Sequence, residues 1–182
     1  MTPPPDDPEI PRGIAVPDAS PVTVHFDGAC QTVGRRRVAA YGCTVEGAGL
    51  AHEECGLAVP PGHPRSTNNV AEYIGAIRAL EWLAAVPYAA DVLVQGDSEL
   101  VIRQMNGEYA VHADHLKPYH ERLGQLARRF HHVEFRWVPR EQNRRADELS
   151  KEGIDSVGIP PPRAAKSSDG EDVGDDADEP SD

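Results

Sequence analysis

Four acidic residues in this sequence stand where loops are expected to meet strands and helices. Asp27 follows the alternating segment VTVHF, Glu72 lies in TNNVAEY, Asp97 in QGDSEL and Asp147 in NRRADELS. Groups placed at strand ends and helix starts collect at one edge of a sheet. Carboxylates gathered there raise one another's pKa unless a cation lies between them. Since all-oxygen donors select a hard ion, the pattern predicts a site for Mg²⁺ or Mn²⁺.

Three of these acids also have simple structural interpretations, which the sequence leaves open. Asn69 and Glu72 fit a capping pair at the start of a helix, and Asp97 fits a cap for the helix that follows it. Asp147 would favour the positive end of a helix dipole. Asp27, at the expected end of a strand, has no such structural role.

The elements that must position these residues follow from the hydrophobic pattern. Residues 22–26 alternate as a half-buried strand does, and the chain from 68 to 86 repeats its apolar residues at helical spacing. Strands are expected over 22–26, 38–47, 50–59, 91–96 and 133–138, and helices over 68–86, 98–105, 114–130 and after Asn143. Three sequential strands followed by alternating helices and strands predict an α/β fold with a mixed sheet and helices on its faces.

The acidic charge of the chain is concentrated at its two ends. The 182 residues carry a formal net charge of −12, but residues 160–182 hold two basic and eight acidic side chains and residues 22–159 hold 15 basic and 18 acidic ones. The balanced middle does not exclude a polyanionic partner. We expect an acidic, Pro-rich disordered tail over 1–21, a folded domain over 22–155 and an acidic disordered tail over 156–182.

Other classes of protein are excluded by composition. The three cysteines, Cys30, Cys43 and Cys55, form no CxxC pair, so neither a disulfide framework nor a zinc site is predicted. The sequence contains no apolar run long enough to span a bilayer, and its first residues do not resemble a signal peptide. We therefore expect a cytoplasmic protein without membrane contact.

Four strings together resemble type 1 ribonuclease H, in its small single-domain archaeal and bacterial form. They are FDGAC (26–30), TNNVAEYIGAIRAL (67–80), GDSELVIRQMNGEY (96–109) and WVPREQNRRADELS (137–150). The resemblance implies a ribonuclease H-like five-stranded mixed sheet, three antiparallel strands then two parallel, with helices on both faces. It also implies a monomer that hydrolyses the RNA strand of RNA/DNA hybrids with two metal ions, leaving 5′-phosphate and 3′-hydroxyl ends.

The resemblance also implies a role for each matching position. Asp27, Glu72, Asp97 and Asp147 match the metal-binding catalytic acids, with Asp27 in the bridging place. Positions matching segments that contact the hybrid are Gly28, Ala29, Cys30, Asn68, Asn69 and Glu99, with Thr67 at a phosphate of the DNA strand. Many members carry a His where Trp137 stands here, and Arg140 is expected to act in its place.

Alternatives remain at this stage. The three arginines of the turn after the first strand, Arg35, Arg36 and Arg37, are either solvated surface or phosphate contacts beside the site. A nuclease of the same fold acting on double-stranded RNA or another nucleic acid is one rival function. A non-catalytic nucleic-acid-binding protein is the other, although such a protein would gain affinity by losing these acids.

Overall fold

A computed structural model of the protein describes residues 21–87 and 91–157. Its centre is one five-stranded sheet with the order β3-β2-β1-β4-β5. The strands are β1 (Val22–Val33), β2 (Arg36–Gly47), β3 (Leu50–Leu57), β4 (Asp91–Gly96) and β5 (His132–Trp137). β1, β2 and β3 pair antiparallel, while β1 with β4 and β4 with β5 pair parallel. The predicted five-stranded mixed sheet is confirmed.

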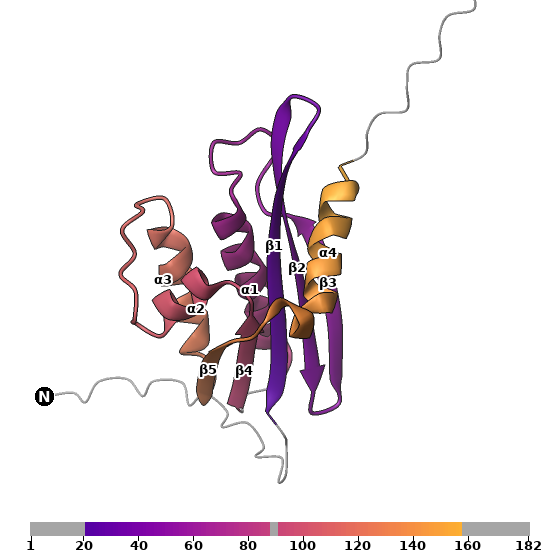
Figure 1. Ribbon diagram of the computed structural model, residues 1–182. Helices are drawn as coiled ribbons and strands as arrows, with labels where there is room; N and C mark the ends of the chain where they lie inside the picture. The colour runs from indigo at the N-terminus through magenta and orange to yellow at the C-terminus, as the bar shows by residue number, and fades with distance from the viewer. Residues whose placement is uncertain (1–20, 88–90, 158–182) are drawn as a thin grey trace, which may run out of the picture.

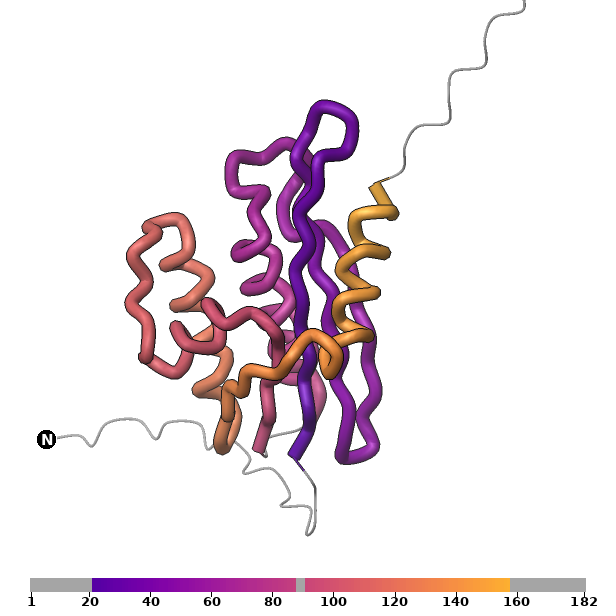
Figure 2. The backbone as a smooth tube through the Cα atoms, in the orientation of Figure 1, coloured from indigo at the N-terminus to yellow at the C-terminus, as the bar shows by residue number. Residues whose placement is uncertain are grey.

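Helices cover both faces of this sheet (Figure 1). They are α1 (Asn68–Ala85), α2 (Glu99–Met105), α3 (Lys117–Ala127) and α4 (Arg144–Asp155), with a short 3₁₀ turn η1 (Arg140–Gln142) before α4. α1 packs on β1 and β2 with α3 behind it, and α4 packs on β1, β2 and β3 from the opposite side. The chain that follows β5 runs past β4 and β1 to the start of α4, and so connects the edge of the sheet to the helix on its opposite face (Figure 2).

The alternating pattern of β1 explains how the layers are held together. Val22, Val24 and Phe26 are fully buried in the main apolar core, which Tyr73 and Leu80 of α1 complete. Burial of each large apolar side chain contributes about 1.5–3 kcal/mol. The opposite face under α4 has a much smaller apolar cluster, so polar residues of β1 and α4 can meet there.

Two elements differ most in their bounds from the sequence expectation. The first strand does not end at residue 26, because residues 27–33 continue to pair with β2 as far as the hairpin turn. The expected helix over 114–130 is the shorter α3, with Pro118 in its first turn, where its missing N–H leaves no unpaired acceptor. Within 21–87 and 91–157, no helix is both long and apolar enough to cross a membrane. The expected tails lie almost wholly outside the described residues.

Candidate active site

The four acids meet where β1 and β4 separate. The parallel pairing of these strands runs to His25 and Gln95, after which β4 ends and the chain turns into α2. β1 continues with β2 as partner, and Asp27 lies on this continuation, opposite Gly42. Asp27 is therefore in the middle of a strand, not at its end as expected. What ends beside it is the neighbouring strand, which leaves room for a pocket.

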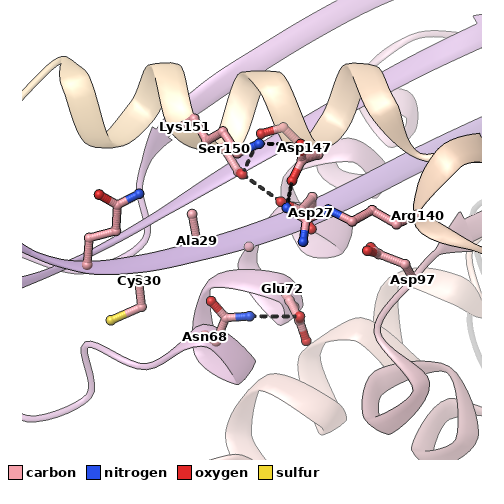
Figure 3. A pocket seen from close by; sticks show the side chains of 12 residues that line it. Asp27, Ala29, Cys30, Asn68, Glu72, Asp97, Arg140, Asp147, Ser150 and Lys151 are labelled. Atoms are coloured by element: carbon pink, nitrogen blue, oxygen red, sulfur yellow. Dashed lines mark hydrogen bonds and ion pairs between the residues drawn. The ribbon is translucent and has the colours of Figure 1, made fainter.

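A pocket of about 260 Å³ occupies this place. All four predicted acids line it: Asp27 from β1, Glu72 from α1, Asp97 after β4 and Asp147 from α4. Figure 3 shows Asp27 between the α4 side chains and Glu72, with Asp97 at the side. The other lining residues are Gly28, Ala29, Cys30, Gln31, Asn68, Arg140, Ser150 and Lys151.

Two glycines allow both helices to approach this part of the sheet. A Cβ at Gly28 would lie 2.3 Å from the backbone N of Glu72, and a Cβ at Gly42 would lie 2.4 Å from the backbone N of Ser150. Such distances are far below van der Waals contact, so any side chain at either position would push a helix away. Gly28, predicted as a substrate contact, is thus also required for packing.

Asp27 is the most central acid of the pocket. Its side chain is largely buried, and the hydroxyl of Ser150 donates to its Oδ2 over 2.5 Å. Burial, with the nearby charges of Asp97 and Asp147, raises the pKa of Asp27 to about 6 although the Ser150 hydrogen bond acts to lower it. The carboxylate is therefore held at an electrostatic cost that a cation would remove.

Glu72, on α1, is a second buried acid with a raised pKa. Burial raises the pKa of Glu72 to about 7, and the charges of Asp27 and Asp97 add to this effect. Its two oxygens accept hydrogen bonds from the hydroxyl of Ser98 and, over 3.2 Å, from the amide of Asn68. The alternative of a capping pair of Asn69 and Glu72 is not realised, because Thr67 is the N-cap of α1 and its hydroxyl accepts from the backbone N of Val70.

Asp97 is held by groups from two other segments. The amide of Asn143 donates to its Oδ1 over 2.8 Å and to the backbone O of Phe26 over 2.9 Å. The indole of Trp137 donates to the backbone O of Asp97 over 3.1 Å. Asn143 precedes α4 as expected, but its side chain makes no cap hydrogen bond. Ser98, not Asp97, caps α2.

Asp147, in the first turn of α4, is paired with two cationic side chains. Arg140 contacts its Oδ1, and Lys151, one turn later, lies 2.5 Å from its Oδ2. Burial acts to raise the pKa of Asp147, but the hydrogen bonds and charges of Lys151 and Arg140 outweigh it and lower the pKa. Arg140 thus lies at the site, as the sequence predicted, and faces an acid in this structure.

The donor set fits a hard divalent ion, since four carboxylates line one pocket whose lining includes no histidine, and the thiol of its one cysteine, Cys30, donates to the backbone O of Ser66. Among residues 21–87 and 91–157, no three acidic, histidine or cysteine side chains are arranged to hold an ion as they stand. The contacts already described explain this arrangement. The carboxylate of Asp147 contacts Arg140. The other three carboxylates accept hydrogen bonds from serine hydroxyls or side-chain amides.

Some residues expected at the substrate do not line the pocket. Thr67, Asn69 and Glu99 lie outside its lining, and Glu99 pairs with Arg103 on the exposed side of α2. The triple-arginine segment is at the far end of the β1–β2 hairpin, and none of its three residues lines the pocket. All three cysteines are free thiols, of which Cys43 is buried and Cys30 and Cys55 are partly exposed.

Sequence reasoning missed four polar residues that hold the acids. They are Ser98, Asn143, Ser150 and Lys151. Ser150 and Lys151 follow Asp147 by three and four residues, which places them on the same helix face and would have indicated them. No local pattern indicates that the Asn143 side chain would contact β1 and Asp97 instead of capping its own helix.

Comparison with known proteins gives several relatives of this chain. The family model described as Reverse transcriptase-like matches residues 26–153. Ribonuclease HI of Halobacterium salinarum is 36% identical over 137 residues, which are 75% of this chain and 65% of that protein. The bifunctional protein Rv2228c of Mycobacterium tuberculosis is 40% identical over 94 residues, 51% of this chain. The matched segment spans only 25% of the length of Rv2228c and of two further mycobacterial relatives.

Solved structures agree with these relatives. The crystal structure of RNase H1 from Halobacterium salinarum matches with a TM-score of 0.64 and 32% identity, over 75% of this chain and 99% of that one. LC11-RNase H1 in complex with an RNA/DNA hybrid matches with a TM-score of 0.62 and 34% identity, over 75% of this chain and 98% of that one. Both likenesses cover most of the described fold.

Proposed function

Because this chain belongs to the type 1 ribonuclease H family, of the archaeal and bacterial kind, we propose that it hydrolyses the RNA strand of RNA/DNA hybrids. The observation that carries the proposal is the pocket in which Asp27, Glu72, Asp97 and Asp147 come together from four separate elements. One relative of the same fold was solved with such a hybrid bound.

We further propose that the pocket works with two divalent ions, Mg²⁺ or Mn²⁺. The ions would lower the pKa of the attacking water and stabilise the leaving 3′ oxygen, giving 5′-phosphate and 3′-hydroxyl ends. Asp27 would serve both ions from its central place, Glu72 and Asp97 would hold one side, and Asp147 the other. Burial supports this reading, since it leaves Asp27 and Glu72 costly to ionise in the absence of a cation.

The rim of the pocket supplies the groups that would recognise the RNA strand. Ala29, Cys30 and Asn68 line the pocket beside the acids. Proteins distinguish RNA from DNA through the 2′-hydroxyl, which accepts and donates hydrogen bonds. Backbone groups of β1 and the Asn68 amide are suited to this contact. Three residues outside the pocket lining are still proposed to contact the strands beyond the cleaved bond: Thr67, Asn69 and Glu99.

Arg140 is proposed to act on the scissile phosphate or the departing product. Its side chain is two-thirds exposed at the pocket and reaches Asp147. A guanidinium matches phosphate geometry and keeps its charge at all relevant pH values. On hybrid binding, the Asp147 contact would be exchanged for a phosphate oxygen.

The deciding experiment compares substrates under defined ion conditions. The full chain is incubated with labelled RNA/DNA, RNA/RNA and DNA/DNA duplexes in Mg²⁺, Mn²⁺ or EDTA, and products are resolved with their end groups. We expect cleavage of the RNA strand of the hybrid alone, in the presence of ions alone. Cleavage of RNA/RNA would favour a double-stranded RNA nuclease, and ion-independent binding without cleavage would favour a nucleic-acid-binding protein. A monomeric, cytoplasmic protein stays a prediction.

A further inference from the structure

Ser150 makes a contact that an ordinary helical serine does not. It is fully buried in α4, and its Oγ lies 2.5 Å from Asp27 Oδ2 and 2.9 Å from the backbone O of Asp147. A hydroxyl has one proton to donate. The charged carboxylate is the nearer and stronger acceptor, so the proton belongs to the bond with Asp27.

The packing of α4 keeps this hydroxyl in place. A Cβ at Gly42 would lie 2.4 Å from the Ser150 backbone N, and a Cβ at Gly153 would lie 2.9 Å from the Cβ of Ala40. The helix therefore lies directly on the backbone of β2, the strand that pairs with Asp27. Because β1 and β2 are held by their ladder, the distance between Ser150 and Asp27 is fixed by backbone contacts on both sides.

We propose that Ser150 is a positioning residue that fixes the rotation of the Asp27 carboxylate for ion binding. This inference rests on the proposed function, in which Asp27 serves two ions. A carboxylate that binds an ion on each side must keep the plane of its two oxygens fixed. A hydrogen-bond donor to one of these oxygens fixes that plane. Without the donor, the carboxylate rotates about its Cβ–Cγ bond and must be ordered by the ion itself.

A second effect of the same hydrogen bond has the opposite sign, which makes the proposal testable. A donor withdraws negative charge from the carboxylate, so its loss would by itself make Asp27 a better ion ligand. Loss of a group that orients a ligand lowers metal affinity, typically by about 10- to 100-fold. At a pH well above the pKa of Asp27, where the carboxylate is ionised with or without the donor, the sign of the change in affinity distinguishes positioning from charge withdrawal.

The chain offers a matched control in the same helix region. The hydroxyl of Ser156, at the end of α4, donates to the backbone O of Gly153 over 2.8 Å, as Ser150 could to Asp147, but it does not line the pocket. Ser156 is exposed, so Ser156→Ala matches Ser150→Ala in the loss of a local hydroxyl bond but leaves the pocket untouched. Ser150→Ala removes the contact with Asp27 as well.

The experiment measures Mn²⁺ affinity of the full chain without nucleic acid, by isothermal titration calorimetry, for wild type, Ser150→Ala and Ser156→Ala. We expect Ser150→Ala to bind Mn²⁺ about tenfold more weakly and Ser156→Ala to bind as wild type does, with all three melting within a few degrees of one another in EDTA. In cleavage assays, Ser150→Ala should lose kcat at low Mn²⁺ with KM for the hybrid unchanged, and saturating Mn²⁺ should restore kcat.

Unchanged or tighter Mn²⁺ binding by Ser150→Ala would overturn the proposal, as would an equal loss in Ser156→Ala. A melting temperature lowered by more than a few degrees in Ser150→Ala, with kcat not restored by Mn²⁺, would give Ser150 a structural role instead. If wild type neither binds Mn²⁺ nor cleaves the hybrid in its presence, the proposed function fails, which is a different result.

Discussion

The amide of Asn143 donates one hydrogen bond to the carboxylate of Asp97 and a second to the backbone of Phe26, and so connects the start of α4 to the middle of β1 and the end of β4. Both acceptors are on segments that reach the pocket from elsewhere in the chain. The side chain is fully buried, so its two donors have no water to replace these partners. Asn143 thus sets the distance between the Asp97 and Asp147 sides of the pocket.

We expect Asn143→Ala to lower both stability and activity. Leaving the buried carbonyl of Phe26 and the partly buried carboxylate of Asp97 without this donor destabilises by about 2 kcal/mol, and Asp97 loses its fixed orientation. Thermal melts and kcat on the hybrid test this. The control is Asn106→Ala, which removes a similar amide bond to the backbone O of Phe135, outside the pocket. The control should lose stability with kcat unchanged, and equal effects on kcat would contradict the interpretation.

Asp27→Asn and Asp97→Asn should each abolish cleavage while the fold remains. An amide keeps the shape of the side chain but not the charge proposed to hold the ions, so we expect at least about a thousandfold loss, about 4 kcal/mol of barrier. Single-turnover cleavage with far-UV circular dichroism as the folding control tests this. Asp27→Asn should also bind the hybrid in EDTA at least as tightly as wild type. Cleavage near the wild-type rate by either variant would refute the metal-site assignment.

The ion-free protein should lose stability as the pH rises from about 4 to about 7. The folded pKa values of Asp27 and Glu72 are raised to about 6 and about 7, so the unfolded chain releases these protons first and unfolding is favoured through this interval. Each group contributes on the order of 3 kcal/mol. Thermal melts in EDTA at several pH values measure the loss, which Mg²⁺ should reverse at the upper end.

The matched variant for this pH dependence is Asp27→Asn, which has no carboxyl to titrate at that position. Its melting temperature in EDTA should fall less between the same pH values. A wild-type stability that does not change over this interval, or an equal fall in the variant, would show that burial does not hold these acids as the structure indicates.

Arg140→Ala should lower kcat by at least about tenfold, about 1.4 kcal/mol of barrier, with KM changed much less. Arg140→Lys should recover part of the loss, because the charge returns without the forked geometry. The contribution of Arg140 should show no inflection between pH 6 and 7, which distinguishes it from a histidine in this role. Full activity of Arg140→Ala would make its contact with Asp147 a surface ion pair.

Removal of residues 160–182 should leave the melting temperature nearly unchanged, because this segment has almost no apolar side chains to bury. It also removes a net charge of −6, so hybrid affinity should increase at low salt and the gain should fade as salt screens it. Binding titrations at two ionic strengths measure both effects. A large loss of stability would place the domain boundary later than residue 155.

The sequence alone indicated most of the strands, the helices and the four acids, since each depends on local patterns. The alternation of Val22, Val24 and Phe26 predicts a half-buried strand, and it forms one. The four short motifs that contain these acids are enough to indicate the family. Arg140 and Asp147 are seven residues apart around one helix start, and their proximity follows from that spacing.

Tertiary structure decided how the acids are held. The contacts of Ser150 with Asp27 and of Asn143 with Phe26 join residues 123 and 117 positions apart, and no local preference specifies them. They exist because Gly28 and Gly42 let two helices lie on the sheet backbone, and because β4 ends where β1 continues. Burial at that place, not residue type, raises the pKa values of Asp27 and Glu72. The sequence shows which residues are carboxylic acids, but the free energy needed to ionise them depends on the groups that the fold places around them.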